Sequence, residues 1–226
     1  MGVDPVSDTV TVVSEADLKI GGPFIVVNRA SGQVLEHENL DAGNVLRHPT
    51  RPLVYLSFFR RRDQLMLYDL ESRRVSHTAP ADLRAERMAF WKQANEVLVT
   101  SPMESRVMRF DADHLRPKGH IPAPFGARAI ALDEPRQLLL CGNIATGYVT
   151  LIDLRTGRPL RSYYLGPWLR TIALHVESGT AYVSSLGALY RLSYASPIVQ
   201  SPGPVTGHRE PASGPDVPPR RSEQER

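Results

Sequence analysis

The sequence is poor in cysteine. Cys141 is the only cysteine among 226 residues, which excludes an intramolecular disulfide and any site built from several cysteines. It stands at the end of the apolar run Leu138-Leu139-Leu140, and this position predicts a buried structural thiol.

The common catalytic motifs are also missing. No GxSxG, HExxH, P-loop or GxGxxG pattern occurs, and the seven histidines show no spacing typical of a metal site. His114 and His120, the closest pair, are expected in a solvated loop. We therefore expect no metal ion and no cofactor.

Long apolar runs are missing as well. No stretch approaches the ~20 apolar residues of a transmembrane helix. The N-terminus carries Asp4 and Asp8 and shows no apolar run of secretory-leader length. The sequence as written therefore predicts a cytoplasmic protein without membrane insertion.

Composition divides the chain into a folded part and a tail. Hydrophobic residues make up 42% and charged residues 23%, as in an ordinary globular domain. Seven of the nineteen prolines fall in residues 197–226, where acidic and basic residues cancel, so we predict a disordered tail and no nucleic-acid binding. Residues 1–20 are predicted to be weakly ordered or an edge strand, and residues 21–196 to form one domain.

The segment GYVTLIDLRTGRPLRSYYLG, residues 147–166, is typical of a β-hairpin. Two apolar runs flank Asp153 and Gly157, which suit a short turn. The same polar landmark recurs at Asn28, Asp69 and Asp111, with intervals of 41, 42 and 42 residues up to Asp153. We interpret these side chains as turn-forming groups within a repeat.

A second landmark has the same period. The stretches that begin at Val45, Met88, Ile130 and Ile172 are separated by 43, 42 and 42 residues. Each holds an apolar strand, a polar turn and another apolar strand. Together the landmarks indicate four short strands per unit, and a period near 40 residues is typical of propeller blades.

One segment favours a different structure by local propensity. PADLRAERMAFWKQANEVL, residues 80–98, is rich in helix-forming residues and has Asp82 as a candidate N-cap. Met88 and Phe90 nevertheless occupy strand positions of the repeat. We expect strands here, because tertiary context outweighs propensity.

The repeats resemble a known family. VYLSF, EVLVTS and TAYVSS, followed by LYDLESR and LIDLRTG, are similar to the YVTN-type β-propeller repeats, relatives of the NHL and WD40 propellers. The resemblance covers residues 21–195 and implies an all-β propeller of four to five blades, or part of a larger one. Complete family members usually form seven blades, and many act outside the cytoplasm.

The repeat count leaves the closure of the propeller open. Three full copies are flanked by two partial ones, since the copy before Val45 lacks a convincing inner strand and the last copy stops near Tyr194. Residues 24–40 could complete the C-terminal blade. Alternatively, a second copy or another polypeptide completes a larger ring, or the chain is a fragment.

Three arginines recur just before the inner-strand positions: Arg87, Arg128 and Arg170. In a propeller these positions face the mouth of the central channel, where guanidinium groups could bind a carboxylate or phosphate. Trp168 stands in the loop before Arg170 on the same face. The alternative is that each arginine caps a loop or pairs with a carboxylate such as Glu86, Asp133 or Glu134.

A second basic feature predicts a partner-binding surface. The run FFRRR combines two aromatic residues with three cations in one loop, a mixture enriched at protein interfaces. Its residues are Phe58, Phe59, Arg60, Arg61 and Arg62.

Two function classes follow from these observations. The first is a non-catalytic binding or scaffold protein that engages a protein partner, another copy of itself or a small anionic ligand through its loop face. The alternative, implied by the resemblance, is a lactonase-like hydrolase or a quinoprotein-type dehydrogenase subunit. The arginines without an accompanying general base favour binding.

Overall fold

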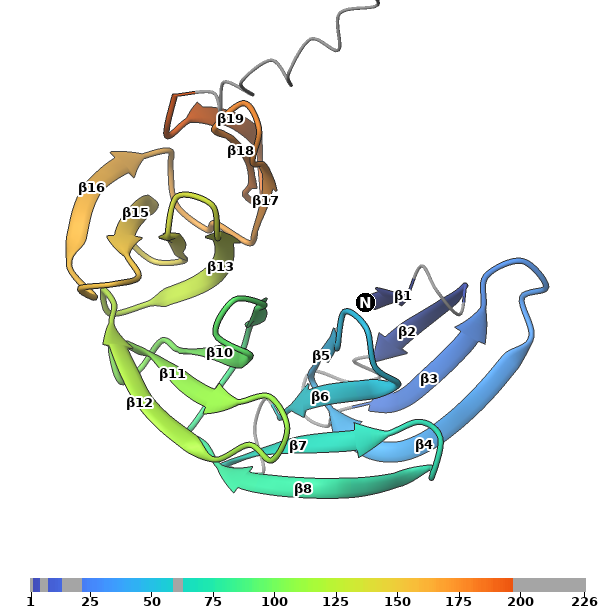
Figure 1. The fold of residues 1–226 in the computed structure, drawn as a ribbon. Coiled ribbons are helices and arrows are strands. Elements are labelled where there is room, and N and C mark those ends of the chain that lie inside the picture. The colour runs from blue at the N-terminus through green and yellow to red at the C-terminus, as the bar shows by residue number, and fades with distance from the viewer. Residues whose placement is uncertain (1, 5–7, 14–21, 59–62, 197–226) are drawn as a thin grey trace, which may run out of the picture.

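The chain folds into five antiparallel sheets that follow one another around a common axis (Figure 1). The computed structural model describes residues 2–4, 8–13, 22–58 and 63–196. These ranges contain no helix, and hence none that could cross a membrane. The predicted all-β class and propeller architecture are confirmed, with five blades.

Four blades contain four strands each, ordered from the axis outward. The first holds β1 (Gly2–Asp4), β2 (Thr9–Val13), β3 (Gly22–Asn28) and β4 (Val34–Ala42). The second holds β5 (Asn44–Arg47), β6 (Leu53–Ser57), β7 (Gln64–Asp69) and β8 (Arg74–Pro80). The third holds β9 (Met88–Trp91), β10 (Glu96–Ser101), β11 (Arg106–Asp111) and β12 (Pro117–Pro122). The fourth holds β13 (Ala127–Asp133), β14 (Leu138–Asn143), β15 (Tyr148–Asp153) and β16 (Pro159–Tyr164).

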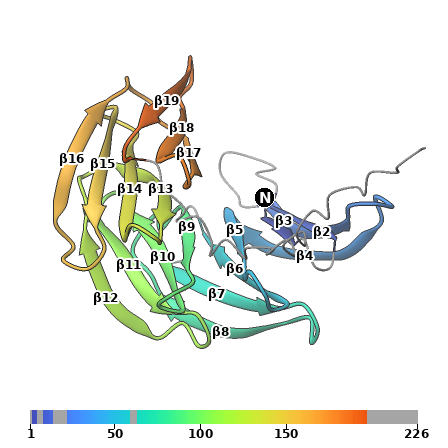
Figure 2. The same cartoon turned by 45° about the horizontal axis from the view of Figure 1, so that its top comes forward.

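The fifth blade has three strands within the described residues. They are β17 (Thr171–His175), β18 (Thr180–Ser184) and β19 (Leu189–Ser193). The innermost strands of successive blades contact one another, from β1 through β5, β9 and β13 to β17. The first and fifth blades are the two ends of this row (Figure 2).

The first blade differs from the expectation for the copy before Val45. Its innermost strand is β1, which pairs with β2 from Gly2 opposite Thr11 to Asp4 opposite Thr9. The strands at residues 24–40 pair with β2 and with each other, and so they do not complete the C-terminal blade. Three residues are too few to show a strand pattern in the sequence.

The segment with high helix propensity forms strands, as the repeat predicts. Met88–Trp91 is β9, and it pairs with β10 from Val99 opposite Met88 to Glu96 opposite Trp91. Trp91 and Val97 are both buried. Burial between two blades outweighs the local preference for a helix.

The recurring polar residues form turns, as predicted. The side-chain oxygens of Asn28, Asp69 and Asp153 each accept a 2.8 Å hydrogen bond from a backbone N–H two or three residues later. Asp111 does the same with the N–H of His114, also at 2.8 Å. In the first four blades, these side chains bind backbone N–H groups of the turn that joins the third and fourth strands.

The hydrophobic core is divided among the contacts between neighbouring blades. Phe24 and Val26 pack against the second blade, and Tyr55 and Leu65 pack against the third. The single thiol, Cys141, is buried between the third and fourth blades, as predicted. Burial raises the pKa of the Cys141 thiol to about 12.

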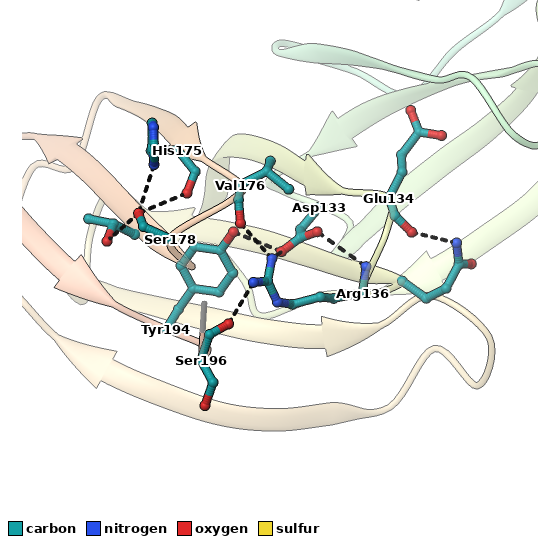
Figure 3. A network of polar contacts seen from close by, with 10 residues as sticks. Asp133, Glu134, Arg136, His175, Val176, Ser178, Tyr194 and Ser196 are labelled. Carbon is teal, nitrogen blue, oxygen red and sulfur yellow. Dashed lines mark hydrogen bonds and ion pairs between the residues drawn. The ribbon is translucent and has the colours of Figure 1, made fainter. Parts of the chain in front are cut away.

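A polar network joins the fourth and fifth blades (Figure 3). The Asp133 carboxylate, which is fully buried, accepts hydrogen bonds from the Tyr194 hydroxyl and from Nη1 of Arg136, both at 2.8 Å. The Arg136 guanidinium also donates to the carbonyl oxygens of Val176 and Ser196, both at 2.6 Å. Burial and Asp133 raise the pKa of the Tyr194 hydroxyl.

We predict that this network stabilises the last blade. Arg136→Ala should lower the free energy of unfolding by about 3 kcal/mol, because it leaves the Asp133 carboxylate buried without its cation. Tyr194→Phe should cost about 1.5 kcal/mol, the value of one hydrogen bond to a charged group. Urea denaturation measures both. Arg155→Ala removes an exposed arginine paired with Asp153 and should destabilise the fold far less than Arg136→Ala does; an equal loss in all three variants would contradict the prediction.

A second prediction concerns pH. The His48 ring is buried against Phe90 of the next blade, and its Nδ1 accepts the backbone N–H groups of Thr50 and Arg51. Burial, with Arg51 nearby, lowers the pKa of His48 to about 4. The unfolded chain takes up this proton near pH 6.5, so the folded state should lose up to about 2 kcal/mol between pH 7 and pH 5.

The measurement is the urea midpoint as a function of pH. His48→Asn should remove this part of the acid sensitivity, whereas His175→Asn, at an exposed ring, should leave the profile unchanged. Parallel pH profiles for all three proteins would show that His48 does not titrate in the expected range.

Candidate functional site

The loops at one end of the blades form the candidate site. In an antiparallel blade, the loop that enters the innermost strand and the turn between the second and third strands lie at the same end. We call this end the loop face. Its described loops in the last three blades are residues 81–87, 102–105, 123–126, 144–147, 165–170 and 185–188.

Backbone hydrogen bonds tie these loops into a row. The N–H of Gly126 donates to the carbonyl of Pro102 at 2.8 Å, that of Ile144 to Gly126 at 3.1 Å, and that of Trp168 to Ile144 at 2.9 Å. The row crosses from the third blade to the fifth. The loop face is therefore a connected surface.

A cavity of about 360 Å³ lies at the axis, where four innermost strands begin. The only charged side chains in its described lining are those of Arg87 and Arg170. Both residues are anchored by their main chains, since the N–H of Arg87 donates to Oγ1 of Thr100 and that of Arg170 to the carbonyl of Ser184. The rest of the lining is Gly43, Asn44, Val45, Leu46, Met88, Ala129, Ile130, Thr171 and Ile172.

Arg128 does not line this axial cavity. Its guanidinium forms an ion pair with Glu86, the pairing that we named as the alternative. The pairing of β13 with β14 shifts register between Ala127 and Ala129, so Arg128 sits in a bulge, and a bulge redirects its side chain. The structure thus brings two of the three predicted arginines together at the axis.

The Glu86–Arg128 pair lines a second pocket, of about 290 Å³, on the loop face. Met103, Phe125 and Ile144 contribute apolar walls, and Arg84 adds a cation. Burial raises the pKa of the Glu86 carboxyl, and Arg128 and Arg87 oppose this effect. The sequence identified Glu86 only as an ion-pair partner, because nothing in the repeat pattern marks a buried carboxylate.

Trp168 lies on the loop face, outside the lining of the axial cavity. Its indole is exposed and its φ is +63°, which is unusual for a residue other than glycine. Met103 and Phe125 are exposed on the neighbouring loops of the hydrogen-bonded row. Exposed methionine and aromatic side chains are typical of protein contacts.

The predicted partner surface at residues 58–62 is described only at Phe58. This side chain is buried in the core between the first and second blades, near Phe24 and Leu56. It therefore contributes packing instead of a solvent-facing contact. Phe59, Arg60, Arg61 and Arg62 lie outside the described residues.

Among the described residues, no group of three or more histidine, cysteine, aspartate or glutamate side chains could hold a metal ion. His114 lies edge-on to His77, with 5.0 Å between the ring centroids.

Fold and site together define a β-propeller with a cationic cavity at its axis. Comparisons with protein-family models and with curated protein sequences find no match. Among solved structures, a chain of hydrazine synthase from Kuenenia stuttgartiensis is similar, with a TM-score of 0.68 and 11% identity. The match covers 81% of this chain and 54% of that one, so this chain spans about half of its length.

At 11% identity the likeness concerns the fold alone. It supports the blade architecture that the resemblance to YVTN-type repeats implies. Membership of that family stays a prediction.

We predict that Gly147 is required for the loop row. Its φ is +76°, and a Cβ added there would collide with the carbonyl group of Gly166. Gly147→Ala should lower the free energy of unfolding by about 2 kcal/mol or more, from positive-φ strain and the collision together. Gly32→Ala is the matched control, since φ is +70° there and the space around the Cβ is open. Equal losses in urea denaturation would mean that the approach to Gly166 is unimportant.

Proposed function

We propose that the chain is a non-catalytic binding protein whose axial cavity holds a small anionic ligand. The observation that carries this proposal is the pair Arg87 and Arg170, which line one cavity that has no acidic side chain in its described lining. Two cations from different blades converge there on a space of about 360 Å³.

The chemistry of arginine supports an anion. A guanidinium group presents donors in a planar fork that matches carboxylate and phosphate oxygens, and it stays charged at all working pH values. The Asn44 side chain and the polar groups of Thr171 add neutral donors to the lining. The volume is at the small end for ligand pockets, which favours a dicarboxylate or a phosphate ester.

Binding is favoured over catalysis by the residues at the cavity. A hydrolase or dehydrogenase site needs a titratable group within reach of the reacting atoms. The described lining offers no carboxylate or imidazole. Glu86, whose burial raises its pKa, belongs to the neighbouring pocket and is engaged by Arg128.

A protein partner on the loop face is the second candidate. Met103, Phe125 and Trp168 are exposed on loops that hydrogen bonds hold together, and Arg84 lies beside them. The two candidates use different residues, so variants separate them. A ligand lost in Arg87→Ala and kept in Phe125→Ala occupies the axial cavity, and the reverse pattern indicates a partner on the loops.

The experiment is isothermal titration calorimetry with inorganic phosphate, succinate and citrate at low salt. We expect at least one of these anions to bind, and Arg87→Ala and Arg170→Ala each to weaken binding tenfold or more, because a charge-assisted hydrogen bond contributes about 1.5–3 kcal/mol. Arg161→Ala, at an exposed site on β16, removes the same charge and should change affinity less than twofold. Absence of binding, or an equal loss in Arg161→Ala, would refute the proposal.

A further inference from the structure

In the second, third and fourth blades, the face that lies toward the following blade is buried. Equivalent positions on the second strands of the second, third and fourth blades are Tyr55, Leu98 and Leu140, all 0% exposed. Equivalent positions on the third strands are Leu65, Val107 and Val149, also 0% exposed. We call this side of a blade its forward face. Apolar side chains occur there because another sheet covers them.

The fifth blade also carries large apolar side chains at these positions of its forward face, but there they are exposed. Tyr182 occupies the position of Leu140, and Leu189 occupies that of Val149, since Leu189 pairs with Ser184 as Val149 pairs with Gly142. Tyr182 is 43% exposed and Leu189 is 73% exposed. Ala173, which lies opposite Tyr182 in the sheet, is exposed too.

The opposite face of the same strands is covered by the fourth blade. Ala181, Val183 and Leu192 are buried against the fourth blade. The fifth blade therefore has one covered face and one solvent-facing face, on which Tyr182, Leu189 and Ala173 lie beside the exposed Arg191 that pairs with Tyr182. A large tyrosine and a leucine on an open sheet face mark a contact surface.

The first blade carries the complementary side. In the following blades, the rearward face presents small aliphatic side chains to the preceding blade, such as Val97 and Val99 on β10 or Ala181 and Val183 on β18. In the first blade these positions are Val10 and Val12 on β2.

The neighbouring strand extends this aliphatic surface. Val10 and Val12 pair with Val27 and Ile25 on β3. All four side chains are only half-buried. The alternate residues of the same strands, such as Thr11 and Phe24, are buried toward the second blade.

We propose that these two faces bind each other between two copies of this chain, head to tail. The forward face of the fifth blade, with Tyr182 and Leu189, would receive the rearward face of the first blade of a second copy. A second copy is the occupant because both halves of a blade-to-blade contact are present on one chain, at the two ends of the row (Figures 1 and 2).

The contact is heterologous, since different patches meet. Each copy therefore keeps one unused face at its other end, which allows a closed ring or a chain of copies. The association is independent of anion binding in the axial cavity, because it uses residues outside that lining.

The first test is the mass of the full chain by size-exclusion chromatography with light scattering at about 100 µM, far above the Kd expected of an extended apolar contact. We expect at least twice the mass of one chain, and we expect this mass to fall toward that of one chain on dilution. Tyr182→Lys with Leu189→Glu should weaken association so far that the mass falls to that of one chain at the same concentration. The control is Tyr164→Lys with Leu160→Glu, which places the same charges on exposed positions of β16 and should leave the mass unchanged.

The second test is specific to a head-to-tail contact. Val12→Glu places a charge on the rearward face of the first blade and should also give single chains. When it is mixed with the Tyr182→Lys, Leu189→Glu variant, each protein keeps one intact face, so a one-to-one complex should form. Thermal unfolding followed by circular dichroism checks that each variant folds. If Val12→Glu does not fold, Ile25→Lys replaces it.

Several results would overturn the proposal. A wild-type chain that stays single at 100 µM would mean that the ends close on each other or meet a different polypeptide. Association that persists in the Tyr182→Lys, Leu189→Glu variant would place the contact elsewhere. Folded variants that remain single after mixing would exclude the head-to-tail arrangement.

Discussion

The contact between neighbouring blades is the interaction on which the rest of this structure depends. Each blade is a small antiparallel sheet, and a sheet of three or four strands gains its stability by burying apolar side chains against a neighbour. Stacking covers those faces, and the core is accordingly divided into clusters that each lie between two blades. Polar contacts also join neighbouring blades. The Glu134 carboxylate accepts N–H groups of Lys92 and Gln93 from the preceding blade, and Asp133 joins the following one.

The stacking also creates the axial cavity. Since every blade presents the start of its innermost strand to the same axis, residues far apart in the chain become neighbours there, as Arg87 and Arg170 do. Both residues directly precede an innermost strand, and their main chains are hydrogen-bonded to Thr100 and Ser184, so the fold fixes where the two arginines start. A ligand would meet cations already in place, which reduces the ordering cost of binding.

Periodicity made most of the fold predictable. The turns at Asn28, Asp69, Asp111 and Asp153 have the predicted role, because a side chain that bonds to the backbone just ahead of it is a local property. The strand at Met88–Trp91 was predictable from the repeat against its own propensity. The direction of individual side chains was not predictable from the periodicity. A bulge directs Arg128 toward Glu86, and Phe58 packs into the core between the first and second blades. Both effects depend on neighbours that the sequence pattern does not specify.

The burial of Cys141 has a practical consequence. A thiol with a pKa near 12 is protonated at neutral pH and has almost no nucleophilic form, and it is enclosed between the third and fourth blades. It can react with a disulfide reagent only in molecules whose blades have separated. Because the chain has no other thiol, its labelling rate counts these openings directly, and the native sequence therefore carries its own reporter of how often two blades come apart.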